Sequence, residues 1–460
     1  MGTHTKVLRR PRTVTLKVSM SLRIESRRTA HLLGVLIVLS GTIVIVWQAG
    51  SLFKSRVQYR PKIVALPPSV VQIGDVDPTV LLNQIVGSGH VDDRALAEIE
   101  KRGLPSLTAA AEFVAARYEH EHNRDEQALS HIQRALESSP GNAGLHIWCA
   151  ALMLNSGQLA DAVTQSEQAA QLEPESADVQ RIRGLAYYQA GRRDDAIAAW
   201  EHSLQLAPNQ IVQEYLEKVK REAAVEEHFT ETARGHFVLR YEGGQPAEAL
   251  TDDLLRTLER DYDELSLDLG VAPKNATIVV LYSAQQFSDV TQAPSWAGAI
   301  NDGRMRIPLG EVSSVTPQLE TLLRHELTHS FVHSAVPNCP VWLNEGLAQL
   351  EEPKSLDVLT ASLGPQARSG EFVPLSQLEG SFQGMTPEQA QRAYIESLAA
   401  AEYLRSAYGM DGLRRLLLQL SDGEQPEAAL RTLTMGGYAD LDREAEAYWA
   451  KRVHSAPGHE

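Results

Sequence analysis

Residues 319–352 read LETLLRHELTHSFVHSAVPNCPVWLNEGLAQLEE, and this stretch decides how the second half of the chain is interpreted. A Thr-Pro pair precedes an apolar-periodic run, which predicts a helix containing the pentapeptide HELTH. Residues four apart share one helix face, so His325 and His329 present two imidazoles about one turn apart. Two such nitrogens can bind one tetrahedral zinc ion, with Glu326 placed beside the metal as a general base.

A third ligand follows after one short loop. Pro340 is typical of a helix N-terminus, and Glu345 stands 16 positions after His329. A carboxylate on a second, antiparallel helix would complete a site of two histidines and one glutamate, with water in the fourth position. The spacing therefore predicts one Zn²⁺ per chain, bound by His325, His329 and Glu345.

For three neighbouring side chains the sequence allows both a structural role and a role at the metal site. Asn344 either caps its helix or contacts the metal ligands or a substrate. His333 lies four residues after His329, and packing is favoured over metal ligation for its side chain. Cys339 precedes the helix that carries Glu345, and a thiolate ligand there is disfavoured.

The flanking residues predict an α+β domain. Residues 235–242 (GHFVLRYE), 276–283 (ATIVVLYS) and 303–309 (GRMRIPL) have strand patterns, and residues 247–269 have helical apolar spacing. After Glu352 the chain is expected to be helical to its end. We therefore expect a zincin-like domain at 235–355 and a helical C-terminal layer of the same domain at 356–460.

The motif HELTH followed by PVWLNEGLAQ resembles the gluzincin metallopeptidases, the thermolysin and aminopeptidase superfamily, and within it the bacterial peptidase MA-like domains. The resemblance covers about residues 235–450. It implies peptide-bond hydrolysis, with His325, His329 and Glu345 as zinc ligands and Glu326 as the general base.

The resemblance also implies two features outside the motif. The strand around residues 304–309 would be an edge that binds a peptide by β-addition. A downstream hydroxyl would stabilise the oxyanion, and Tyr394, in the stretch AYIESLA, is the candidate. A half-buried tyrosine on a helix predicted over 387–408 is the alternative reading of Tyr394.

An internal repeat of 34 residues precedes this domain. The repeat is marked by prolines, by glycines and by small residues at equal offsets: Pro140, Pro174 and Pro208; Gly157 and Gly191, with Asn123 in the equivalent place; Ala128, Ala162 and Ala196. This pattern resembles the tetratricopeptide repeat and predicts an all-α solenoid at 91–229. Such arrays bind proteins, so we expect a protein partner there, with a plain spacer as the alternative. Cys149 falls in a packing column.

Charge separates the N-terminus from the rest. Residues 1–62 hold twelve Lys and Arg and one acid, within a chain of 43 Lys and Arg, 59 Asp and Glu and net charge -16. The acidic body argues against nucleic-acid binding. Leu32–Gly50 is 19 residues long without a charge, which predicts a single transmembrane helix. A cleaved signal peptide is the disfavoured alternative.

The basic flank then predicts a single-pass membrane protein. Residues 1–31 would form a cytoplasmic tail, 32–50 the membrane anchor and 51–90 a linker. The main body would be extracytoplasmic, periplasmic in a bacterium. The leading hypothesis is a membrane-anchored zinc metallopeptidase that acts on an extracytoplasmic protein or peptide. The alternative is a non-catalytic repeat scaffold with a structural or vestigial zincin-like domain.

Overall fold

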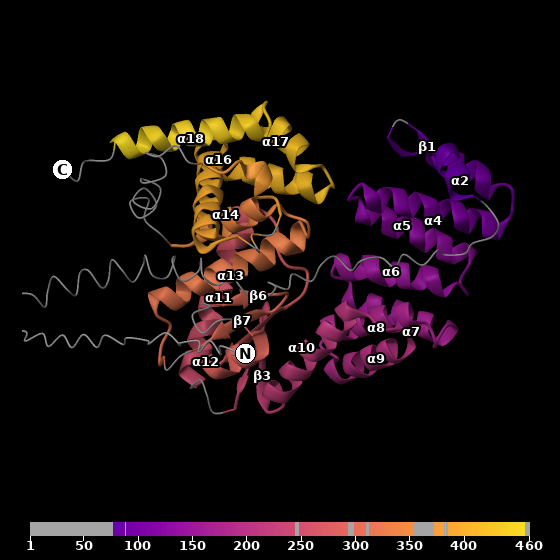
Figure 1. Ribbon diagram of the computed structural model, residues 1–460, viewed down its shortest axis with the longest axis horizontal. Coiled ribbons are helices and arrows are strands. Elements are labelled where there is room, and N and C mark those ends of the chain that lie inside the picture. The colour runs from indigo at the N-terminus through magenta and orange to yellow at the C-terminus, as the bar shows by residue number, and fades with distance from the viewer. Residues whose placement is uncertain are drawn as a thin grey trace, which may run out of the picture. The chain divides into compact units, whose positions relative to one another are not determined.

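The computed structural model describes residues 77–87, 89–243, 248–292, 299–309, 312–353, 372–380, 382 and 385–455 (Figure 1). The first part of this range is a helical array. Its core consists of three helix pairs, which are α4 (Pro105–Glu121) with α5 (Asp125–Ser138), α6 (Ala143–Asn155) with α7 (Leu159–Leu172), and α8 (Ala177–Gln189) with α9 (Arg193–Leu206). The helix α10 (Gln210–Glu226) follows the last pair.

The array is extended at its N-terminal side by short elements. These are α2 (Pro78–Ile85), the hairpin of β1 (Val86–Gly87) and β2 (His90–Val91), and α3 (Asp93–Glu100). Leu81 and Ile85 are buried in the same hydrophobic core as the repeats. Helix α2 therefore packs on the array, although it lies in the stretch predicted as a linker.

The turns inside the helix pairs explain the 34-residue period. Asn123, Gly157 and Gly191 occupy equivalent turns, and all have positive φ, at 58°, 74° and 78°. This left-handed conformation favours glycine, and asparagine tolerates it. The second helix of each pair ends two residues before a periodic proline, which cannot continue the helix. The predicted solenoid is confirmed.

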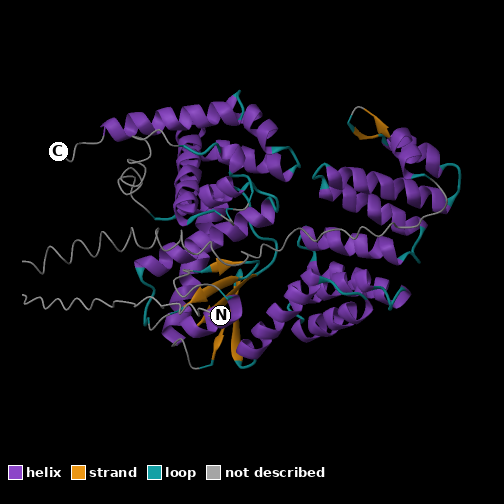
Figure 2. Ribbon diagram, viewed as in Figure 1, coloured by secondary structure: helices purple, strands orange, loops and turns teal. Residues whose placement is uncertain are grey.

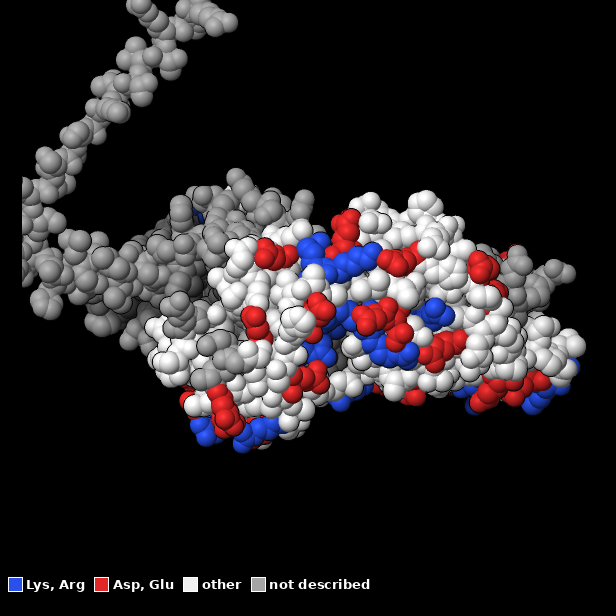
Figure 3. All heavy atoms as spheres, turned by 90° about the horizontal axis from the view of Figure 1, so that it is seen from below, with Lys and Arg blue, Asp and Glu red and all other residues white. Residues whose placement is uncertain are grey.

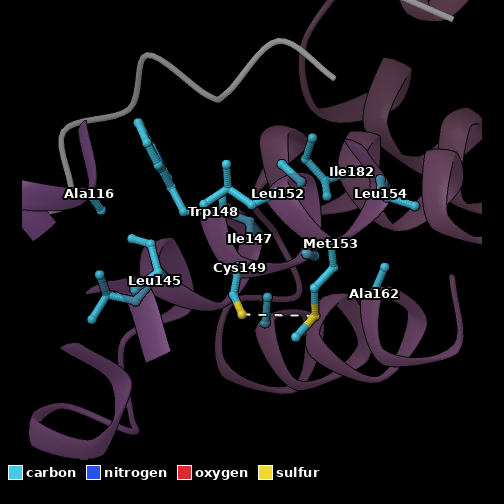
Figure 4. Packing of buried hydrophobic residues seen from close by; sticks show 14 of the residues in the cluster. Ala116, Leu145, Ile147, Trp148, Cys149, Leu152, Met153, Leu154, Ala162 and Ile182 are labelled. Atoms are coloured by element: carbon cyan, nitrogen blue, oxygen red, sulfur yellow. Dashed lines mark hydrogen bonds between the residues drawn. The ribbon is translucent and has the colours of Figure 1, made fainter. Parts of the chain in front are cut away.

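Small side chains set the spacing of the helices. Ala128, Ala162 and Ala196 are fully buried where the paired helices meet. Cys149 on α6 is also buried, and its thiol contacts the Met153 sulfur at 3.9 Å (Figure 4). Burial raises the pKa of the Cys149 thiol to about 12, so this cysteine is the packing residue that the sequence predicts.

The second part contains a five-stranded mixed sheet with the order β3-β4-β5-β7-β6 (Figure 2). The strands are β3 (Phe229–Arg234), β4 (Phe237–Glu242), β5 (Thr277–Tyr282), β6 (Ile300–Asn301) and β7 (Met305–Pro308). Strands β4, β5 and β7 are parallel, whereas β3 and β6 are antiparallel to their neighbours. The predicted peptide-binding strand at 304–309 corresponds to β7, which pairs on both sides, so the edge position belongs to β6.

Both faces of the sheet are covered by helices. On one face Val279 and Leu281 join the core that contains α11 (Glu248–Leu269) and α13 (Pro317–Ala335). On the other face Val280 and Tyr282 pack with residues of α12 (Ala284–Thr291) and with Val225 of α10. Alternate side chains of a strand point to opposite faces, so the central residues 278–281 of β5 are all apolar.

The C-terminal layer is mainly helical from Pro387 on, whereas residues 354–371 of the predicted helical stretch lie outside the described residues. It comprises the 3₁₀ turn η1 (Leu375–Gln377), α16 (Pro387–Ser421), α17 (Pro426–Thr434) and α18 (Tyr438–Ser455). Gly409, at φ 69°, interrupts α16, one residue after the predicted helix end. The buried Trp342 of α14 (Val341–Glu351) donates a hydrogen bond to the Tyr438 hydroxyl at 3.1 Å, which ties this layer to the motif helices.

The membrane prediction requires a correction. The stretch Leu32–Gly50 lies outside the described residues. Among the helices of the described ranges, none is at once long enough and apolar enough to cross a bilayer. The long helix α11, for example, carries charged residues along its whole length. On this finding the predicted transmembrane helix in the fold class is wrong, as is the single-pass membrane placement with an extracytoplasmic body.

Candidate metal centre

The helix that carries HELTH is well anchored. Thr316 caps α13 by accepting a hydrogen bond from the Leu319 N–H, and Pro317 occupies the first turn. Arg324 then pairs with Asp261 of α11 at 3.2 Å and with Glu351 of α14 at 3.3 Å. Since these carboxylates belong to two different helices, Arg324 fixes α13 relative to both.

The second helix, α14, begins at Val341 after Pro340, as predicted. Its first two N–H groups donate to the carbonyls of Glu379 and Leu378, both at 3.0 Å. Gly346 lies against α16, where a Cβ atom would approach the Ser397 carbonyl oxygen to 2.3 Å. The glycine of NEGL therefore permits the close approach of α14 to α16, and this packing positions Glu345.

The three predicted ligands converge. The Nε2 atoms of His325 and His329 are 3.2 Å apart, and a Glu345 carboxylate oxygen lies 3.9 Å from the first and 3.6 Å from the second. Zinc–ligand bonds of about 2.0–2.1 Å at tetrahedral angles place donor atoms about 3.3 Å apart. The three observed distances fit this geometry within about 0.6 Å, and the donor set of two imidazoles and one carboxylate suits zinc.

Both imidazoles are oriented through their other nitrogen. His325 Nδ1 lies 2.8 Å from a Glu352 carboxylate oxygen, and His329 Nδ1 lies 3.1 Å from the Asn344 amide oxygen. Each acceptor favours a proton on Nδ1, which leaves the Nε2 lone pair directed at the cluster. Asn344 is thereby assigned a contact with a predicted ligand.

Glu326 is buried beside the cluster. Its backbone carbonyl accepts a hydrogen bond of 2.7 Å from the Asn301 side chain, which also donates to the Ser330 hydroxyl at 2.7 Å. Burial raises the pKa of Glu326 to about 7; His325 opposes this shift and Glu345 reinforces it. A carboxyl group that titrates near neutrality is suited to accept and return a proton.

The acidic surroundings also raise the pKa of His325, and here the raised pKa favours the charged form of the side chain. Burial lowers the pKa of this imidazole, but the hydrogen bond and charge of Glu352, with Glu326 and Glu345, outweigh burial and raise the pKa to about 9. The neighbouring carboxylates thus favour positive charge at His325. A divalent cation would supply that charge at the same place.

Tyr394 lies on α16, in the layer that packs on α14. Its ring meets the Phe382 ring edge-on, with centroids 5.6 Å apart, and its carbonyl accepts a hydrogen bond from Gln349 at 2.9 Å. Its part as oxyanion stabiliser stays a prediction. His333 and Cys339 lie in the C-terminal half of α13 and in the following loop, and neither belongs to the cluster of His325, His329 and Glu345.

Two residues that contact the metal-site helix α13 were not predicted from the sequence. Glu352 directly follows α14 as its C-terminal cap residue, in extended backbone, so the helical periodicity of α14 did not indicate its contact with His325. Asn301 comes from the edge strand β6, and no pattern near residue 301 indicated its contact with α13.

A buried ionic network joins α10 to the sheet. Arg306 of β7 is fully buried and pairs with Glu222 at 2.7 Å and with Asp302 at 3.0 Å. Burial opposes ionisation of Glu222, but the charges of Arg306 and Lys218 keep its pKa below the usual range. The family resemblance implied an edge strand at residues 304–309, and the sequence analysis did not predict a buried charge there.

Comparison with known proteins agrees with the two-part organisation. Residues 261–450 match the Peptidase MA superfamily. Residues 121–184 and 177–210 match tetratricopeptide repeat families. No curated protein matches the chain.

Among solved structures, a mutant of the Thermobaculum terrenum O-GlcNAc transferase is similar at 13% identity, with 83% of this chain and 98% of that chain covered. The TM-score of 0.24 is too low for this likeness to carry an argument. From these three family matches, this chain contains a Peptidase MA superfamily domain at residues 261–450, preceded by tetratricopeptide repeats at residues 121–210.

Proposed function

We propose that the chain is a zinc-dependent metallopeptidase of the gluzincin type that hydrolyses peptide bonds of a protein or peptide. The observation that carries this proposal is the convergence of His325, His329 and Glu345 within zinc-ligand distance, next to a buried glutamate. Membership of the domain in the Peptidase MA superfamily supports a peptide substrate. When bound there, zinc supplies a Lewis acid that polarises the scissile carbonyl and acidifies water.

The residues of the chain have distinct parts in this proposal. His325, His329 and Glu345 hold the ion. Glu326 accepts a proton from the attacking water and returns it to the leaving amine. The Tyr394 hydroxyl donates a hydrogen bond to the oxyanion that develops on the carbonyl.

The proposed domain roles follow from the same division. The helical segment 91–229 recruits a protein substrate or partner, a role supported by its tetratricopeptide repeats. The segments 235–355 and 356–460 together make up the peptidase domain. Residues 1–76 lie outside the described residues and take no part in the proposal.

The test is cleavage that depends on Glu326. The purified parent and the Glu326→Gln variant, both loaded with zinc, are incubated with a proteome-derived peptide library, and new termini are identified by mass spectrometry. We expect cleavage by the parent and none by Glu326→Gln, with zinc retained by both. Glu320→Gln, which changes an acid in the first turn of the same helix, should cleave like the parent.

Equal peptide products from the parent and Glu326→Gln would refute the peptidase assignment. A parent that retains zinc but cleaves nothing would favour the non-catalytic repeat scaffold.

A further inference from the structure

We propose that the repeat array forms one wall of a substrate subsite beside the metal cluster, and that this subsite accepts an apolar side chain of a peptide. The inference rests on the proposed peptidase function and adds a specificity determinant outside the peptidase domain. The cavity concerned has a volume of about 270 Å³. Its lining includes His329 and Glu345 of the cluster on one side and residues of α6, α8 and their turns on the other.

The position of the repeat wall is fixed by specific contacts. The Asn275 side chain donates a hydrogen bond of 2.7 Å to the Gly157 carbonyl, in the turn between α6 and α7. Arg304 donates to the Tyr188 carbonyl at 3.0 Å, and its guanidinium lies 4.7 Å from the centroid of the Tyr188 ring. Hydrogen bonds and charge contacts are directional, so they hold the wall at a defined place.

The buried ionic network also joins the helical array to the sheet, through α10. Arg306 of β7 and Glu222 of α10 are both fully buried, and Arg304 pairs with Glu222 as well, at 3.4 Å. Removing one partner of a buried pair leaves an uncompensated charge, which is strongly unfavourable. The network therefore adds a buried contact between α10 and the sheet.

The chemistry of the cavity favours an apolar occupant. Leu154 and Leu185 line it from the repeats, and Val332 and Val336 line it from α13. Lys274, Asp302 and Arg304 line it as well. Arg304 is engaged by Glu222 and Tyr188, and Asp302 pairs with Arg306. A cavity of about 270 Å³ lies below the range of about 300–1,000 Å³ for sites that enclose a whole small ligand, so it matches the scale of side chains.

The edge strand β6 borders this cavity and offers an extended peptide a strand to pair with. Asn301 of β6 lines the cavity, and β6 is one of the two terminal strands of the sheet, the other being β3. A peptide added beside an edge strand projects alternate side chains to the same side. One such side chain would enter the cavity while the neighbouring peptide bond lies near His329 and Glu345.

The face drawn in Figure 3 shows no charged patch of one sign that would select a peptide by its charge. Basic and acidic side chains are interspersed there with uncharged residues, so this face presents no field of one sign to guide a charged segment. The proposed selectivity therefore rests on the shape and polarity of the cavity.

The test uses tryptophans that fill the cavity from the repeat side. Ser156, at the end of α6, and Gln189, at the end of α8, both line the cavity and are half-buried. Ala190 occupies the place equivalent to Ser156 in the next repeat, is exposed, and lies outside the lining. Ser156→Trp and Gln189→Trp are therefore compared with the matched control Ala190→Trp. Two cavity-filling variants are used so that the test still holds if one of them does not fold.

Binding is measured separately from catalysis. All three variants are made in the zinc-loaded Glu326→Gln protein, and fluorescence anisotropy reports the Kd of labelled octapeptide pools with Leu, Phe, Ala or Asp fixed at one central position. We expect the Leu and Phe pools to bind at least about 10-fold more tightly than the Asp pool, and both cavity-filling variants to lose this preference. Ala190→Trp should retain it.

The outcomes separate this inference from the proposed function. An apolar preference that survives both cavity-filling variants, or no apolar preference at all, overturns the subsite. If the preference behaves as expected but the parent cleaves no peptide, the subsite stands and the peptidase function fails.

Discussion

The substitution Gly346→Ala tests how the metal centre is positioned. A Cβ atom at this residue would lie 2.3 Å from the Ser397 carbonyl oxygen and 3.0 Å from the Ala401 Cβ atom. An ordinary contact begins near 3.4 Å, so α14 and α16 must separate by about 1 Å. Overpacking of this kind costs about 1–3 kcal/mol, and the better helix propensity of alanine offsets about 1 kcal/mol. We expect a net loss of unfolding free energy of up to about 2 kcal/mol.

The effect on the site should be larger than the effect on stability. Glu345 precedes Gly346 on α14, so a shift of about 1 Å moves its carboxylate beyond the tolerance of about 0.5 Å for a functional site. A misplacement of this size is expected to lower kcat/KM about 100-fold.

The assay combines zinc affinity, from competition with a chelator, with peptide cleavage and urea unfolding. Gly380→Ala is the control, because a Cβ atom there meets nothing within 4 Å. If Gly346→Ala binds zinc and cleaves peptides as well as Gly380→Ala does, the close approach of α14 to α16 does not position Glu345, and the reasoning is refuted.

Three further predictions concern the ionisable side chains of Glu352, Arg306 and Glu396. Glu352→Gln weakens the acceptor on His325 Nδ1 and should reduce zinc affinity about 10- to 100-fold in a chelator titration; unchanged affinity would exclude that role. Arg306→Met leaves Glu222 buried without its 2.7 Å partner and should lower the unfolding free energy by about 3–5 kcal/mol in urea, so a loss below about 1 kcal/mol would contradict the network. Burial raises the pKa of Glu396 from 4.5 to about 8, so the folded chain keeps a proton that the unfolded chain releases, and this group's contribution to stability is lost as pH rises through that window. Glu396→Gln should therefore have a higher Tm than the parent at pH 8.5 and a similar Tm at pH 5; an equal shift at both pH values would disprove the assignment.

The parts of the molecule that follow from local periodicity were predictable. The spacing of His325 and His329 puts both on one face of a helix whatever surrounds them. The turns at Gly157 and Gly191 require left-handed backbone, and glycine at a period of 34 indicates such turns directly. The position of Glu345 followed because a short loop between two helices makes them neighbours in space.

The parts that depend on distant partners were not predictable. Arg306 belongs to a strand with an ordinary alternating pattern, and its burial depends on Glu222, which lies 84 residues earlier on the helix α10. Likewise, β6 rather than β7 is the edge, because strand order is decided by pairing between segments and not by the composition of either strand. The uncharged run Leu32–Gly50 predicted a membrane span from composition alone, and the described helices contain none.

Metal content measured by mass spectrometry tests the central claim most directly. The purified parent should contain one zinc per chain, and His329→Ala and Glu345→Ala should contain less than a tenth of that, while His333→Ala keeps the parent's content. A parent without zinc after incubation and desalting, or a Glu345→Ala variant with full zinc content, would show that the two motif helices do not form a metal centre.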